Sequence, residues 1–258
     1  MVKTSMVVRP LVFFLALGIT MGCSRGDSEP PQRGPATPLD PATTGTIAGK
    51  VIFRGTPPAP SRPQIKGDPA CVVEQPDTAG DVLVHDGLVE SAFVYVKEGL
   101  ANRVFELPKA PVTIDQKSCR YLPHVVGAQT GQEIFFLNSD ATLHNVHTQP
   151  KLSSAVNFGM GVKGSKRPIR INKSEVMVTV KCDVHPWMRA YIGVLDHPYF
   201  AVTGPDGAFR LENLPPGTYT LEAWHEHFGQ REAKVTLSEK GKAEIELAFG
   251  GEESSPGK

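Results

Sequence analysis

Apolar residues along this chain recur in short runs, and several of those runs alternate apolar with polar positions. A repeat of two is typical of a strand that buries one face, whereas an amphipathic helix repeats about every 3.6 positions. Segments rich in Gly, Pro, Asn and Asp separate the runs, and these residue types favour turns. The pattern predicts an all-β chain built from many short strands.

The expected strands are rich in β-branched or aromatic residues. They are residues 46–53, 91–96, 112–114, 124–128, 132–137, 168–171, 175–180 and 191–195. Gln129-Thr130-Gly131 lies between two of these runs, so we expect a hairpin-like pair there. Pro57-Pro58-Ala59-Pro60 ends the first strand because proline cannot donate a backbone hydrogen bond, and residues 61–80 are expected to form a loop.

The N-terminus has the order of features expected of an export signal. Lys3 and Arg9 precede an apolar run, residues 11–19, which is shorter than the roughly 20 residues of a membrane-spanning helix. Gly22-Cys23 resembles the end of a bacterial lipobox, although Thr20 stands where Leu is usual. The resemblance implies a lipoprotein signal peptide, residues 1–23, with lipidation of Cys23. Ordinary signal cleavage is the alternative.

Residues 24–44 contain Pro, Gly, Ser, Thr and charges without a periodic apolar face, so we expect a disordered tether. We expect residues 250–258 to be a disordered tail. A tethered, lipidated chain would be periplasmic or at the cell surface, anchored to a bacterial membrane.

Composition adds little beyond this. The chain has 258 residues and a formal net charge of zero, which allows one or two domains and gives no electrostatic reason to bind nucleic acid. No basic block with interleaved aromatic residues is present, so nucleic acid is not an expected partner.

Lys181 to Arg189 is the segment richest in candidate chemistry, because it contains a thiol, an imidazole and a thioether: Cys182, His185 and Met188. A mononuclear electron-transfer copper site takes one thiolate and two imidazoles near one plane, with a weak axial thioether. The second imidazole must come from elsewhere. Asn138 to His147, which follows a strand-like run, supplies His144. The sequence therefore predicts one copper ion cycling between Cu(I) and Cu(II).

The Cys-x2-His-x2-Met loop, with Pro186 after its His, and the upstream His-Asn-Val-His resemble the motifs of amicyanin-type cupredoxins over residues 111–197. The resemblance implies a Greek-key β-sandwich. It also implies four metal ligands, namely equatorial His144, Cys182 and His185 and axial Met188. Asn145 would tether the two ligand loops, and Pro186 and Trp187 would shape an apolar patch around a solvent-facing edge of His185, the expected electron exit. Leu143 departs from the pattern, which often has Pro there.

Other interpretations of these residues remain. A buried cysteine beside a hydrogen-bonded histidine can be purely structural, and zinc is a second possible metal. His147 should face away from His144 because side chains alternate along a strand. Neither His147 nor His124 is an expected ligand.

The chain has four cysteines. With Cys23 assigned to lipid and Cys182 to metal, Cys71 and Cys119 remain, and an oxidising exported environment favours a disulfide between them. The alternatives are that both are reduced and buried, or that Cys119 and His124 hold a second metal.

Residues 198–249 carry a second resemblance. Phe200 to Leu211 and Leu214 to Leu221, with turns at Asp206-Gly207 and Pro216-Gly217, resemble a carboxypeptidase regulatory-like domain, a smaller transthyretin-type β-sandwich. The strand that usually opens such a domain stands far upstream, at residue 45. We therefore expect the N-terminal strands, residues 45–110, to belong to this sandwich and the copper unit to interrupt it. The alternative places them in the copper sheet.

Together these features predict an exported, lipid-anchored blue-copper protein that carries single electrons and docks transiently with a redox partner protein. The alternative is a non-redox copper-binding or structural cell-surface module with a carbohydrate- or protein-binding sandwich. We do not expect an enzyme, because the sequence shows no Ser-His-Asp or Cys-His catalytic pattern and four ligands would leave no open metal position.

Overall fold

The computed structural model describes residues 33–59, 68–72 and 83–251, together with residues 1, 31 and 65. The predicted signal peptide with Cys23 lies outside the described residues, apart from residue 1. Within the described part of the chain, no helix is long and apolar enough to cross a membrane.

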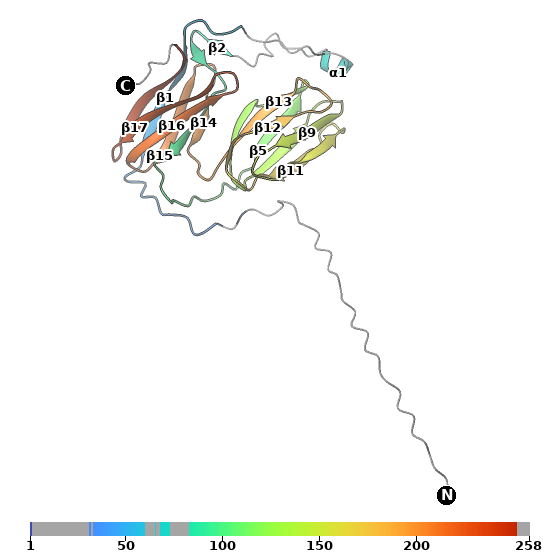
Figure 1. Cartoon of the computed structure of the whole chain (residues 1–258), viewed down its shortest axis with the longest axis horizontal. Coiled ribbons are helices and arrows are strands. Elements are labelled where there is room, and N and C mark those ends of the chain that lie inside the picture. Colours follow the sequence, from blue (N-terminus) through green and yellow to red (C-terminus); the bar gives the residue numbers. More distant parts are fainter. Residues whose placement is uncertain (2–30, 32, 60–64, 66–67, 73–82, 252–258) are drawn as a thin grey trace.

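Strands form two β-sandwiches that lie side by side (Figure 1). The central sandwich pairs a five-stranded sheet with a four-stranded sheet. The first runs β10 (Asn157–Met160), β9 (His144–Gln149), β12 (Glu175–Lys181), β13 (Arg189–Leu195) and β7 (Val125–Gln129). The second runs β11 (Lys166–Arg170), β8 (Glu133–Asn138), β5 (Val112–Lys117) and β6 (Arg120–Leu122).

The flanking sandwich combines strands from both ends of the described chain. In one sheet β1 (Gly45–Arg54) pairs with β15 (Ala208–Leu214), β18 (Lys242–Gly250) and β3 (Leu88–Val89), and β2 (Val84–His85) pairs with β3. The other sheet runs β14 (Phe200–Val202), β4 (Phe93–Glu98), β16 (Gly217–His225) and β17 (Gly229–Leu237). β4 and β14, which pair antiparallel, precede and follow the central sandwich in the chain.

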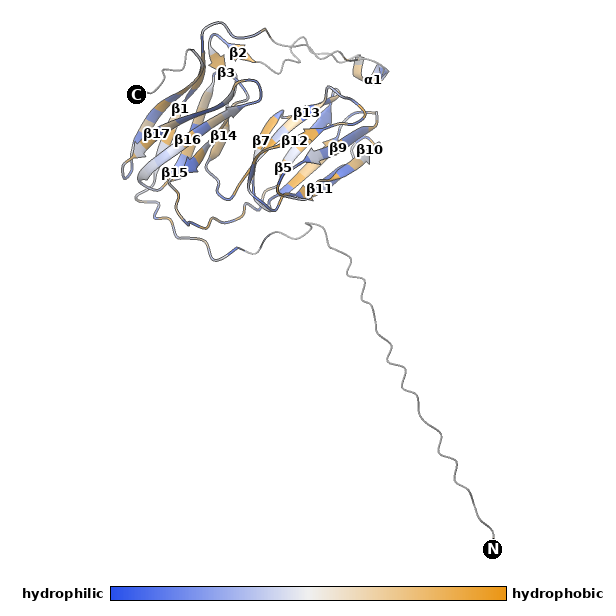
Figure 2. Cartoon of the chain, viewed as in Figure 1, coloured by the Kyte–Doolittle hydropathy of each residue, from blue (hydrophilic) through white to orange (hydrophobic). Residues whose placement is uncertain are grey.

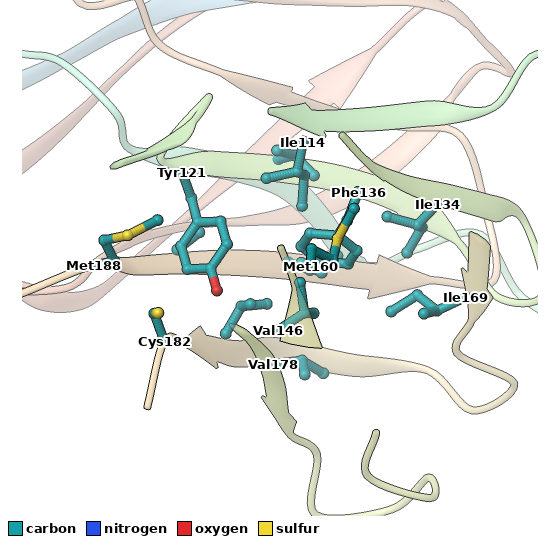
Figure 3. Close-up of a cluster of buried hydrophobic side chains, with 14 of the residues drawn as sticks. Ile114, Tyr121, Ile134, Phe136, Val146, Met160, Ile169, Val178, Cys182 and Met188 are labelled. Carbon is teal, nitrogen blue, oxygen red and sulfur yellow. The ribbon is translucent and has the colours of Figure 1, made fainter. Parts of the chain in front are cut away.

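Each sandwich has its own apolar core, because alternate strand positions face inward. Figure 2 shows hydrophobic and hydrophilic residues interspersed along the strands of both sandwiches. Ile114, Ile134, Phe136 and Val178 are fully or almost fully buried in the central core (Figure 3). Burying each such side chain stabilises the fold by about 1.5–3 kcal/mol. The predicted all-β class with two sandwiches is confirmed.

A smaller buried cluster joins the two sandwiches. Phe93 and Tyr95 of β4 pack with Val125 and Leu195 of the central sandwich. At the edge of this cluster His124 donates from Nε2 to Glu226 Oε1 at 2.5 Å. Burial disfavours ionisation of Glu226, but the hydrogen bond and charge of His124 lower the pKa of this carboxyl overall.

The structure differs from the predicted strand pattern in three places. β7 and β8 are not a hairpin, since Gln129 to Gly131 carry the chain from one sheet of the central sandwich to the other. β10, which is not among the expected strands, pairs with β9. A short helix, α1 (Pro69–Val72), lies in the predicted loop of residues 61–80.

Part of the predicted tether also contacts the folded body. Thr37 donates its backbone N–H to Val104 O at 2.8 Å, and Arg33 Nη2 donates to Thr130 O at 2.5 Å. Arg33 Nη1 also lies within hydrogen-bond distance of Asp196 O, at 3.3 Å. Hydrogen bonds from Arg33 and Thr37 therefore attach this part of the chain to the folded body.

Candidate metal centre

The loop between β12 and β13 brings three candidate ligands into the interior. Cys182 N donates to Met188 O at 3.2 Å, and Met188 N donates to His185 O at 2.9 Å, so the backbone closes a tight turn. Cys182 and His185 are each 2% exposed and Met188 is 1% exposed. Figure 3 shows Cys182 and Met188 at the same end of the central core, beside Tyr121.

His144 is the first residue of β9 and is fully buried. The buried and partly exposed positions alternate along this strand, so His144 and Val146 face inward while Asn145 and His147 face outward. The strand backbone thus directs His144 towards the core and His147 away from it.

The ligand atoms of His144, Cys182 and His185 converge. They all lie within 4.8 Å of one another. The two Nδ1 atoms are 3.0 Å apart, and Cys182 Sγ is 3.9 Å from His185 Nδ1. Two nitrogens bound to one ion at about 2.0 Å each would have a similar separation.

Carboxylates fix which ring nitrogens face inward. His144 Nε2 is 2.7 Å from Asp140 Oδ2, and His185 Nε2 is 3.3 Å from Asp68 Oδ2. An ionised carboxylate only accepts, so each Nε2 donates, and a neutral ring then keeps a lone pair on Nδ1. The two Nδ1 atoms face each other at 3.0 Å, a contact that a metal ion or a shared proton between them would satisfy. The residues present therefore fit a bound metal ion.

The cysteine sulfur lies in surroundings that suit a thiolate. Asn145 N and His185 N each donate to Cys182 Sγ at 3.3 Å. Asn145 also accepts at Oδ1 from Asp183 N, at 3.1 Å, and so connects the two ligand loops. The Tyr121 hydroxyl donates to Asn145 O and lies 3.2 Å from Lys181 O. Tyr121 therefore contacts the backbone of both ligand segments.

Local electrostatics favour neutral imidazole and ionised carboxylate. Burial lowers the pKa of His144 despite the opposing effect of Asp140. Hydrogen bonds from Thr142 and from the backbone of Ala70 lower the pKa of Asp68. A metal ligand must present an unprotonated nitrogen, so this environment prepares His144 for coordination.

The outer edge of His185 is covered, contrary to the expected solvent-facing electron exit. Cys71 of α1 is joined to Cys119 by a disulfide, and Cys71 Sγ lies 3.6 Å from His185 Nε2. Asp68, just before α1, reaches the same nitrogen. Sequence reasoning missed this cover because the contact joins segments that are distant along the chain.

Trp187 and the remaining loop residues lie around this cover. Trp187 Nε1 donates to Cys119 O at 3.1 Å, and its ring centroid is 5.1 Å from that of His185. Pro186 is exposed. Leu143 and Val184, which flank the two histidines in sequence, are 49% and 45% exposed. Apolar surface therefore borders the site although its ligands are buried.

The other two histidines considered from the sequence lie elsewhere. His147 pairs with Asp183 at 3.0 Å on the outer face of β9, and this hydrogen bond lowers the pKa of Asp183. His124 contacts Glu226 of the flanking sandwich. Asp140 and Asp68 were not predicted. Asp140 could have been found from its place four residues before His144, whereas no local signal identifies Asp68.

A family model for the carboxypeptidase regulatory-like domain matches residues 177–249. The match begins in β12 and therefore includes the ligand loop as well as β14 to β18. It supports the resemblance inferred for the C-terminal part of the chain. No curated protein matches the chain.

Three solved structures match part of this chain. A methionine variant of amicyanin in its Cu(I) form is 18% identical, over 41% of this chain and 99% of that chain, with a TM-score of 0.30. A copper-containing nitrite reductase from Thermus scotoductus SA-01 is 21% identical over 39% of this chain and 26% of that one, with a TM-score of 0.31. A purple cupredoxin from Nitrosopumilus maritimus is 16% identical over 32% and 98%, with a TM-score of 0.28. Each of the three covers less than half of this chain.

Proposed function

We propose that the central sandwich binds one copper ion and carries single electrons. The observation that carries the proposal is the convergence of His144, Cys182 and His185, whose ligand atoms lie within 4.8 Å of one another in the protein interior. One thiolate and two imidazoles, with Met188 on the same loop, form the donor set of a mononuclear electron-transfer copper site.

The chain's own residues would hold the site in one geometry. His144 and His185 would hold the ion through Nδ1, Cys182 through its thiolate, and Met188 through its thioether. Asp140 and Asp68 hold the imidazole rings, and two backbone N–H groups donate to the sulfur. A copper ion there would supply the one-electron couple between Cu(I) and Cu(II). Because strands and hydrogen bonds fix the ligands, little rearrangement would accompany electron transfer.

Optical and paramagnetic-resonance spectra of the copper-loaded protein test the proposal. We expect intense blue or green colour from thiolate-to-copper charge transfer, and we expect Cys182→Ser to lose it. Asp183→Asn, which changes the adjacent exposed side chain, is the control and should keep the colour. A colourless Cu(II) form of the folded parent protein would refute the assignment.

A second function is favoured by one observation. His185 is only 2% exposed, so its edge is closed to a partner protein in this conformation. A module that holds copper without exchanging electrons would have no need of an open edge. Rapid oxidation and reduction of the bound copper by small outer-sphere complexes would exclude this second function.

The location and organisation of the chain are proposed as part of the same function. We infer export and lipid anchoring through Cys23, with a transient redox partner in the same compartment. The proposed copper domain, residues 111–197, would be inserted in a sandwich made of residues 45–110 and 198–249. The pairing of Phe200 with Tyr95 supports the insertion, because the chain leaves and rejoins the flanking sandwich at neighbouring strands.

A further inference from the structure

We propose that Asp68 is a positioning residue of the metal centre, where it fixes the imidazole of His185 through Nε2 and closes that ring to solvent. The Cys71–Cys119 disulfide holds Asp68 in this place. This inference rests on the proposed function for the role of His185 as a ligand. Asp68 comes from a segment that is distant in the sequence from both ligand loops.

The carboxylate of Asp68 is oriented independently of His185. Asp68 Oδ2 accepts from Thr142 Oγ1 at 2.5 Å, and Asp68 Oδ1 accepts from Ala70 N at 2.9 Å. Oδ2 is therefore already aimed when it meets His185 Nε2 at 3.3 Å. Thr142 lies two residues before His144, so the same contact connects Asp68 to the first ligand loop.

The disulfide anchors the turn that presents Asp68. Cys71 N donates to Asp68 O at 3.0 Å, and the disulfide joins Cys71 to Cys119, next to β6. Cys71 and Cys119 are fully buried. The bond thus holds a covalently fixed turn against the outer edge of His185.

His144 and His185 differ in how far along the sequence their carboxylate partners lie. Asp140 is four residues from His144, whereas Asp68 is 117 residues from His185. A local partner stays near its histidine whenever the loop is folded. The distant partner depends on the disulfide and on Thr142, so the orientation of His185 can be lost without unfolding the ligand loop.

The contact has two consequences for a bound copper ion. A carboxylate that accepts from Nε2–H increases the electron donation of Nδ1, which favours the more highly charged metal. The cover also keeps water away from the imidazole edge. Removing Asp68 should therefore raise the reduction potential and expose the ring.

A metal-free experiment tests the cover. Apo protein is treated with diethyl pyrocarbonate, and modification of each histidine is followed by peptide mass mapping, with the partly exposed His147 as internal reference. We expect Asp68→Ala and the double variant Cys71→Ala/Cys119→Ala each to increase the modification rate of His185 about tenfold or more, because a charge-assisted hydrogen bond is lost. Asp86→Asn, in an exposed turn of the flanking sandwich, should leave the rate unchanged.

A copper-loaded experiment separates charge from position. Asp68→Asn keeps an oxygen acceptor for Nε2 but removes the negative charge, so His185 should stay protected while the potential rises. Asp68→Ala should raise the potential and also unprotect the ring. Asp86→Asn carries the same charge change far from the site and should not shift the potential.

Two results would overturn the proposal: equal reactivity of His185 in the parent and in Asp68→Ala, or equal potentials in the parent and in Asp68→Asn. If Asp68→Ala fails to fold, the reduction potential of Asp68→Asn and the His185 modification rate of the cysteine double variant test the proposal instead. A protected His185 in a protein whose Cu(II) form is colourless would instead overturn the proposed copper function. The two failures are therefore distinguishable.

Discussion

Removing the Cys71–Cys119 disulfide should strongly destabilise the protein. The two cysteines are separated by 48 positions in the sequence. Closing a loop of this size lowers the conformational entropy of the unfolded chain, and the chain-entropy model gives about 4 kcal/mol at room temperature. Both cysteines are replaced by alanine rather than serine, because serine would place unpaired hydroxyl groups in a buried position. We therefore expect Cys71→Ala/Cys119→Ala to lose about 4 kcal/mol of unfolding free energy.

Urea denaturation of the apo protein measures this loss, and leaving copper out avoids stabilisation by metal binding. The chain has two tryptophans, and the structure places one in each sandwich. Trp187 lies in the ligand loop and Trp224 in β16, so Trp224→Phe and Trp187→Phe backgrounds report the central and flanking sandwiches separately.

The closed loop contains β2, β3 and β4 of the flanking sandwich as well as β5 of the central one. The full effect requires both sandwiches to unfold together, because a folded flanking sandwich would keep part of the loop ordered. Coincident transitions for the two tryptophans with a loss below about 1 kcal/mol would refute the loop-entropy reasoning.

Three further predictions concern other parts of the molecule. Met188→Leu should keep copper bound and raise its reduction potential, because loss of a weak axial donor disfavours Cu(II); voltammetry measures this, and loss of the copper would contradict it. Burial lowers the pKa of His197 to about 4. Because an unfolded histidine titrates near 6.5, roughly 3 kcal/mol of stability present above that pH should be lost as the pH falls towards 4, and urea midpoints for His197→Gln should lack this dependence. A Cβ at Gly193 would lie 2.3 Å from the Phe93 ring, so Gly193→Ala should cost about 1–3 kcal/mol, and an unchanged melting temperature would disprove the close contact.

The sequence predicts what is encoded locally. Cys182, His185 and Met188 stand on one short loop, so their convergence follows from the loop itself. β9 shows the same principle, because alternation along the strand is enough to turn His144 inward and His147 outward.

Contacts between distant segments could not be predicted in this way. The turn at Gln129 to Gly131 has the same residue types whether the chain returns within one sheet or crosses to the facing sheet, so the hairpin prediction was wrong. Likewise, the exposed edge expected for His185 was wrong because nothing near Asp68 in the sequence indicates which side chain it will meet. The tertiary fold alone brings these groups together.

The pairing of β4 with β14 has a consequence for the order of folding. Between these neighbouring strands lies the whole central sandwich, so their pairing requires a long stretch of chain to bring its ends together. Closing a flexible loop of that length costs entropy and slows folding. A central sandwich that has already folded replaces most of that flexible chain by a compact body, with β5 near one end and β13 near the other. We therefore expect the central sandwich to form first, and the flanking sandwich to assemble around the two segments that leave it.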